Sequence, residues 1–109
     1  MKKFAYIITH ELSAELLEDN LLAALEPGNQ EIKLIALFFV DDGIYHLIKG
    51  NRILKKLKAA CASGALAVFA CNQSTKVRKI HNMIFEEAKM GSINDFYLAA
   101  ADADHIIAF

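Results

Sequence analysis

Cys71 is the residue of this chain whose type and position point most directly to chemistry. It follows an apolar run, residues 65–70, and precedes a polar segment, residues 72–75, that predicts the start of a helix. Unpaired backbone N–H groups at a helix start favour the thiolate, which is the nucleophilic form of cysteine. Lys76 and Arg78 follow within two turns and add positive charge. Cys71 is therefore our candidate nucleophile, although a free cysteine more often acts as a small buried hydrophobic residue.

Other polar residues that follow apolar runs could support this thiol. His10 follows the first run and could orient or deprotonate a thiol, or it could simply end a strand. Asp41 and Asp42 follow the second run and precede Gly43, so they could bind a hard cation, but such a pair is more often a turn and helix cap. We predict supporting roles for His10, Asp42 and Arg78.

The remaining cysteine and histidines do not form a recognisable metal site. Cys61 lies among alanines in a predicted helix, where an inert thiol is more common than a partner that resolves a disulfide. Two cysteines are too few to hold a metal alone, and His46, His81 and His105 have no ligand spacing. We predict neither a metal nor a cofactor.

Several enzyme motifs are missing from the sequence. It contains no GxGxxG, no P-loop and no CxxC. The motifs that usually support dinucleotide binding, triphosphate binding and thioredoxin-type redox chemistry are therefore missing. A hydrolase using Cys71 with His10 as base would need an oxyanion hole that the sequence does not reveal. With no classical enzyme motif, enzymatic activity stays an open question at this point.

Composition predicts one small globular domain spanning residues 1–109. The 109 residues suit one hydrophobic core, and 55% hydrophobic content leaves apolar surface for self-association. The net charge of −1 does not favour binding to nucleic acid. We find no export signal and no run of about 20 apolar residues that would span a membrane. We therefore expect a cytoplasmic protein with reduced thiols.

Apolar runs of strand length alternate with segments of helical periodicity. This pattern predicts an α/β fold, a mostly parallel sheet covered by helices on both faces. The expected strands are residues 4–9, 32–40, 65–70 and 105–109. The expected helices are residues 13–25, 44–48, 52–61, a segment from residue 72, and a last one from residue 92. Residues 77–88 fit one helical face, but residues 84–90 could instead contain a short strand.

The order of the strands decides which residues share a site. Ligands bind beyond the carboxyl ends of parallel strands, where the strand order reverses. In a flavodoxin-like order, the first and third strands flank that point. His10 and Cys71 would then open onto one crevice.

The order and spacing of several segments resemble the DsrE/DsrF-like family over nearly the whole chain. The segments that carry the resemblance are the strand at 65–70 ending in Cys71, Arg78 seven residues later, Gly91-Ser92 before a helix, the closing residues 103–109, and residues 39–44 with their glycine-containing turn. The resemblance implies a single three-layer α/β/α domain with five strands. It also favours the short strand within residues 84–90.

The resemblance further implies assembly into trimers or hexamers and, in one branch, a cysteine that carries sulfur as a persulfide. Cys71 matches the position of that cysteine. Members with the relay role tend to have an Arg-Gly pair after it, whereas here Lys79 follows Arg78. Our first hypothesis is a persulfide carrier that receives sulfur from a donor protein and passes it to an acceptor. The alternative is a non-catalytic oligomeric module whose crevice at His10, Asp42 and Cys71 holds a small ligand or a partner loop.

Overall fold

The protein is built around a five-stranded sheet with helical segments on both faces. The computed structural model describes residues 1–29 and 31–109. Its strands are β1 (Lys2–Ile8), β2 (Ile32–Phe39), β3 (Ala67–Cys71), β4 (Lys89–Gly91) and β5 (His105–Ala108). Its helices are α1 (Leu54–Ala62), α2 (Asn72–Val77) and α3 (Ile93–Ala99), with the shorter or irregular helical segments η1 (Glu15–Asn20), η2 (Leu21–Leu25), η3 (Asp41–Leu47) and η4 (His81–Met83).

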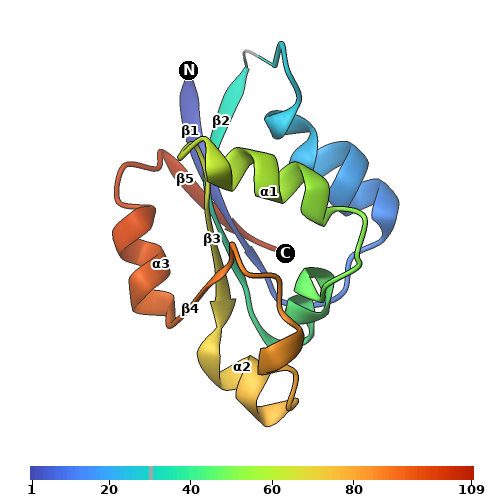
Figure 1. The fold of residues 1–109 in the computed structure, drawn as a ribbon. Helices are drawn as coiled ribbons and strands as arrows, with labels where there is room; N and C mark the ends of the chain where they lie inside the picture. The colour runs from blue at the N-terminus through green and yellow to red at the C-terminus, as the bar shows by residue number, and fades with distance from the viewer. Residues whose placement is uncertain (30) are drawn as a thin grey trace.

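The strand order is β4-β3-β2-β1-β5, and every neighbouring pair is parallel. The predicted three-layer α/β/α architecture is confirmed, with the sheet wholly parallel. The flavodoxin-like order is wrong, because β2 lies between β1 and β3. The direction of the strand order changes where the chain crosses from β4 at one edge of the sheet to β5 at the other edge. The α3 helix lies in this connection, on the face of the sheet opposite α1 (Figure 1).

The two faces of the sheet are covered unequally. The larger core packs β1, β2 and β3 against η1, η2, η3 and α1, and it includes Leu17, Leu22 and Leu57. The smaller core lies under α3, where Phe96 stacks on Phe38 with ring centroids 5.7 Å apart. Among the described residues, α3 is the only helix that contributes to the smaller core. Figure 1 shows α3 along one side of the sheet, and α2 beyond the carboxyl end of β3.

The alternation of side chains along β3 determines which face receives Cys71. Val68 and Ala70 point into the larger core, whereas Phe69 and Cys71 point to the α3 face. In β2 an extra residue interrupts the alternation: Phe4 of β1 pairs with Leu34, but Ala5 pairs with Ala36. From Ala36 onward the alternation places Phe38 on the α3 face as well.

The segment after β3 differs most from the expected elements. The α2 helix ends at Val77, so the predicted helical face over residues 77–88 is wrong. The expected short strand exists, but it occupies Lys89–Gly91 at the end of the range that we assigned. Ile84 instead forms an isolated antiparallel bridge with Ile48.

Candidate functional site

Cys71 lies at the junction predicted from the sequence, as the last residue of β3 and the N-cap of α2. Its Sγ accepts a hydrogen bond from the backbone N–H of Ser74, at 3.5 Å. The cysteine thus takes the capping role that serine or aspartate usually plays at a helix start. The thiol is partly exposed, and it is held in a defined orientation by the first turn of α2.

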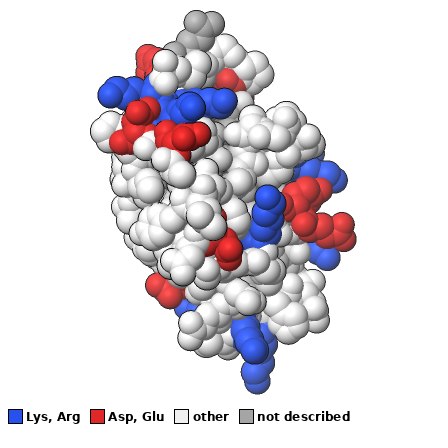
Figure 2. Space-filling view, turned by 90° about the vertical axis from the view of Figure 1, so that its left-hand side faces the viewer, with Lys and Arg blue, Asp and Glu red and all other residues white. Residues whose placement is uncertain are grey.

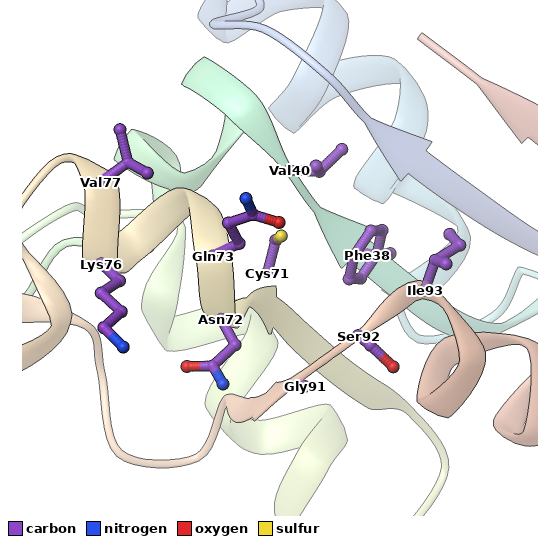
Figure 3. Close-up of a pocket in the computed structure, with 10 residues that line it drawn as sticks. All are labelled: Phe38, Val40, Cys71, Asn72, Gln73, Lys76, Val77, Gly91, Ser92 and Ile93. Atoms are coloured by element: carbon purple, nitrogen blue, oxygen red, sulfur yellow. The ribbon is translucent and has the colours of Figure 1, made fainter.

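A groove of about 770 Å³ opens at Cys71 on the α3 face of the sheet (Figure 3). It lies beyond the carboxyl ends of β2, β3 and β4 and beside the start of α3. Its lining is the apolar set Phe38, Val40, Val77 and Ile93, the polar set Cys71, Asn72, Gln73, Lys76 and Ser92, and Gly91. The volume falls within the range of about 300–1,000 Å³ typical of small-molecule sites.

A second hollow, of about 360 Å³, brings Cys71 together with Arg78. The Arg78 guanidinium is turned toward Asp42, whose Oδ1 accepts from Nη2 at 2.9 Å and from Nε at 3.1 Å. The hydrogen bond to Asp42 raises the pKa of Arg78 above its ordinary value. Arg78 also donates to the carbonyl oxygen of Ser74, at 3.4 Å. Asp42 and Arg78 therefore join η3 to α2 at the site.

Ser74 is a component of this site that the sequence reading missed. Its buried side-chain oxygen accepts the backbone N–H of Asp41 at 2.9 Å, and its own N–H donates to Cys71. Asp41 adopts a left-handed backbone conformation, φ 51°, at the start of η3. Serine is common near helix starts, but only the tertiary contact with Asp41 distinguishes Ser74 from an ordinary first-turn residue.

Gly43 permits the close packing of η3 against β1. A Cβ at this position would lie 2.1 Å from the backbone oxygen of Ile8. The sequence predicted a turn at residues 41–43, and the chain does turn there, at the start of η3. Glycine is needed at position 43 because the backbone of β1 lies too close for a side chain. This contact fixes η3, and with it Asp42, beside α2.

The backbone after Arg78 forms a helix end that normally requires glycine. Lys79 has φ 57°, its N–H donates to the oxygen of Lys76, and the N–H of Ile80 donates to the oxygen of Thr75. These two bonds with a left-handed residue define the Schellman motif, in which glycine is favoured at the position of Lys79. This chain has lysine where the motif favours glycine, and the backbone nevertheless adopts the motif.

His10 does not join the cavities at Cys71. It is exposed, it lies 3.1 Å from the hydroxyl of Thr9 through Nδ1, and it lines neither the groove nor the second hollow. The expectation that it shares a crevice with Cys71 is wrong, because β2 separates the ends of β1 and β3. Cys71 and Arg78 share the second hollow, and Asp42 pairs with Arg78 without lining either cavity, whereas His10 stays apart.

Cys61 lies at the other end of β3. It lines a hollow of about 430 Å³ that also borders Ala67, the first residue of that strand. The four residue steps of β3 separate this end from Cys71 by about 13 Å. Burial raises the pKa of the Cys61 thiol. Both cysteines are free, and Cys61 is not placed to form an intramolecular disulfide with Cys71.

Within residues 1–29 and 31–109, no three His, Cys, Asp or Glu side chains gather as ligands for a metal ion. None of the helices in the same part of the chain is long and apolar enough to cross a membrane.

The fold and site define a class of protein: a small parallel α/β protein with a cysteine at a strand-to-helix junction, facing an open groove. A family model matches residues 2–109, and the chain belongs to the DsrE/DsrF-like family, as the resemblance in the sequence indicated. A search of curated proteins found no match.

Two solved structures share the fold. The YchN protein from E. coli superposes with a TM-score of 0.71 at 19% identity, with 100% of each chain covered. MTH1491 from Methanobacterium thermoautotrophicum, described as a protein of unknown function, has a TM-score of 0.69 at 11% identity, with 98% of this chain and 99% of that chain covered. At these identities the likeness concerns the fold.

Proposed function

We propose that this protein is a persulfide carrier of a sulfur relay and that Cys71 is its sulfur acceptor. Family membership is consistent with sulfur-relay function in the broad sense. The observation that carries the specific proposal is the placement of the Cys71 Sγ on an open groove, oriented by the N–H of Ser74. A thiol held in this way is accessible to a sulfur atom on another molecule while its own backbone stays fixed.

The transfer needs only thiol chemistry. The Cys71 thiolate attacks the outer sulfur of a donor persulfide, R–S–S–H, and a bond forms between Sγ and that sulfur. The bond between the two donor sulfurs breaks, and its electron pair leaves with the donor thiolate, R–S⁻. Repetition of the same step by an acceptor thiolate discharges Cys71. Both steps exchange one sulfur–sulfur bond for another, so no external oxidant or reductant enters the balance.

Asp42 and Arg78 have a positioning role in this proposal. Their ion pair attaches η3 to the end of α2, while Ser74 attaches η3 to its beginning. Because Cys71 is the N-cap of α2, these contacts hold the strand-to-helix junction that presents the thiol. We assign no role in sulfur transfer to His10, which lies outside the groove.

The experiment that tests the proposal is persulfide mapping on the purified protein. After incubation with a cysteine desulfurase and cysteine, peptide mass spectrometry should find one added sulfur on Cys71. The Cys61→Ser variant should keep this modification, and the Cys71→Ser variant should lose it. Labelling of neither cysteine, or of Cys61 alone, contradicts the proposal.

A binding module without sulfur transfer is the second candidate, and the size of the groove favours it. A cavity of about 770 Å³ with several polar groups on its lining can hold a ligand regardless of thiol reactivity. In that case a ligand found by screening would bind Cys71→Ser as tightly as the wild-type protein. Persulfide mapping would then find Cys71 unmodified.

The remaining expectations belong to the same proposal. We propose a cytoplasmic protein that assembles into a trimer or hexamer and meets separate donor and acceptor proteins. Two free thiols suit a reducing compartment. Apolar side chains exposed on the α3 face of the sheet supply a surface for self-association: Tyr97, Leu98 and Ile106.

A further inference from the structure

Part of the polar lining of the Cys71 groove already has intramolecular partners: the Cys71 Sγ accepts the N–H of Ser74, and the Ser92 hydroxyl donates to Asp95. Three other polar side chains of the lining differ. Among the described residues, no side-chain hydrogen bond uses the amide groups of Asn72 or Gln73, and no ion pair uses the ammonium group of Lys76. All three line the groove together with Cys71. These three side chains are therefore available to a ligand.

The charge of the lining has one sign. Among the described residues that line the groove, Lys76 is the only ionisable side chain other than Cys71. The Asp95 carboxylate accepts hydrogen bonds from Ser92 of the lining but is not itself a lining residue. An adjoining hollow of about 420 Å³ shares Asn72 and Lys76 and adds His81 and Met90, again without an acid. Arg78 does not compete for an anion here, because Asp42 already pairs with it. This end of the groove favours a negatively charged group.

The distance between the Lys76 charge and the Cys71 thiol sets a minimum length for a ligand that contacts both. Lys76 is five residues beyond Cys71, which corresponds to a rise of about 7.5 Å along the helix. Figure 3 shows the Lys76 and Asn72 side chains extending on one side of α2, away from the Cys71 sulfur, and Phe38 and Ile93 on the other side of it. A ligand that contacts Lys76 while its sulfur touches Cys71 must be elongated, with the sulfur some distance from the negative charge.

From this arrangement we infer that the groove takes a peptide-sized thiol whose carboxylate binds Lys76 and whose sulfur lies at Cys71. The amides of Asn72 and Gln73 bind the amide groups between these two ends. Thiosulfate does not fit this arrangement, because its charged oxygens lie directly beside its outer sulfur. The inference rests on the proposed function, for which it names a donor class: a carboxylate-bearing small-thiol persulfide.

The chemical step in this donor complex balances as follows. The Cys71 thiolate attacks the outer sulfur of R–S–S–H, the Sγ–S bond forms, and the sulfur–sulfur bond of the donor breaks. The small thiolate leaves with the electron pair and takes a proton from water. Cys71 retains the outer sulfur and its hydrogen.

Binding is tested first, with reduced glutathione as the probe and the Cys71→Ser protein as the receptor, so that no mixed disulfide forms. Titration calorimetry or NMR should detect binding. Adding Lys76→Gln should weaken it by about threefold to tenfold, the effect of losing one charge-assisted contact at a partly exposed site. Lys55→Gln is the matched control, because Lys55 is an exposed lysine of α1 outside every groove described here. No binding, or equal binding by the two lysine variants, overturns the inference.

Sulfur transfer is then measured on the protein with Cys71 intact, using glutathione persulfide in one arm and thiosulfate in the other. The Lys76→Gln variant should raise the KM for glutathione persulfide about threefold to tenfold with little change in kcat, and thiosulfate should be the poorer donor. If both donors load Cys71 equally and Lys76→Gln affects neither, the proposed function stands and this inference fails. If Cys71 takes sulfur from no donor while glutathione binding still depends on Lys76, the site stands and the proposed function fails.

Discussion

Lys79 shows how a single residue can adopt a backbone conformation that its side chain disfavours. Its φ of 57° is required by the Schellman motif that ends α2, and the next residue, Ile80, is buried in the larger core. A residue with a Cβ costs about 1–2 kcal/mol in this region, although glycine loses more chain entropy on folding. The packing of Ile80 and the bonds of the motif hold Lys79 there.

Replacing Lys79 by glycine should stabilise the protein. The relief of the left-handed strain, offset by the greater flexibility of the unfolded chain, leaves a gain of about 0.5–1 kcal/mol in the free energy of unfolding. Urea denaturation measures this change. The matched control is Ala59→Gly, within the exposed part of α1, which should instead lose about 0.5–1 kcal/mol. A loss of stability in Lys79→Gly would contradict the conclusion that the left-handed backbone of Lys79 is strained.

Gly43 carries the opposite constraint, because no side chain fits there. The Cβ of an alanine would lie 2.1 Å from the oxygen of Ile8, which is backbone and cannot turn aside. We expect Gly43→Ala to cost about 3 kcal/mol, by forcing η3 away from β1. Thermal unfolding followed by circular dichroism checks this, and a loss below about 1 kcal/mol would mean that η3 can move freely.

The residues of the site were predictable to different degrees. Cys71 stood out because an apolar strand runs directly into a polar helix start, and both features are local. Ser74 could not be recognised, because its role depends on a contact with Asp41, 33 positions earlier. His10 was misplaced for a related reason: its distance from Cys71 depends on which strands are neighbours, and local patterns do not encode that order.

At the scale of elements, β4 and η3 have features that the sequence pattern does not predict. The longer strands β1 and β2 contain continuous apolar runs, residues 4–8 and 34–39, since parallel strands covered on both faces need apolar residues on both sides. The β4 strand has only the residues Lys89–Gly91, too short to show a period and charged at its start. Its pairing with β3 depends on the sheet already being present, so the family resemblance was a better guide than the periodicity.

The η3 element also contains a histidine that connects it to the loop after β1. The Nε2 atom of buried His46 accepts the N–H of Leu12 at 2.9 Å, and the ring meets the edge of Phe39. Burial lowers the pKa of His46, while Glu11 and the backbone of His10 act in the opposite direction and the charge of the His10 side chain adds to the lowering. Protonation would remove the acceptor that Leu12 uses.

Stability should therefore depend on pH through His46. Its pKa is lower in the folded protein than the value of about 6.5 in the unfolded chain, so below about pH 6.5 the unfolded chain binds the extra proton. The free energy of unfolding should fall as the pH decreases from about 7 to 5. In His46→Gln, whose amide oxygen can replace Nε2 as acceptor, this part of the fall should vanish. An unchanged pH dependence in that variant would contradict the account.

At the scale of the whole molecule, charge and apolar surface are distributed unevenly. Figure 2 shows a broad area without charged side chains on the face that carries α3, with an acidic and a basic group near its centre and further charges toward the margins. Leu98 is 78% exposed on this helix, and Tyr97 and Ile106 also expose large side chains. A broad uncharged surface of this kind is typical of a contact between proteins.

We expect this face to be covered by further copies of the chain. Sedimentation velocity should find a species larger than the monomer, and Leu98→Glu should shift it toward the monomer by placing a charge in the contact. Leu16→Glu is the control, since Leu16 lies on η1 across the sheet and should leave the assembly unchanged. A wild-type protein that stays monomeric at every concentration tested would contradict the expected trimer or hexamer.

The central claim is that Cys71 carries sulfur, and peptide mass spectrometry after loading with a cysteine desulfurase tests it most directly. The account predicts one added sulfur on Cys71, kept in Cys61→Ser and removed by a thiol reductant. The Cys61 thiol, which is partly buried and whose pKa is raised by that burial, should stay unmodified. Sulfur on Cys61 alone, or on neither cysteine, would contradict the account and leave the groove as a binding site without transfer.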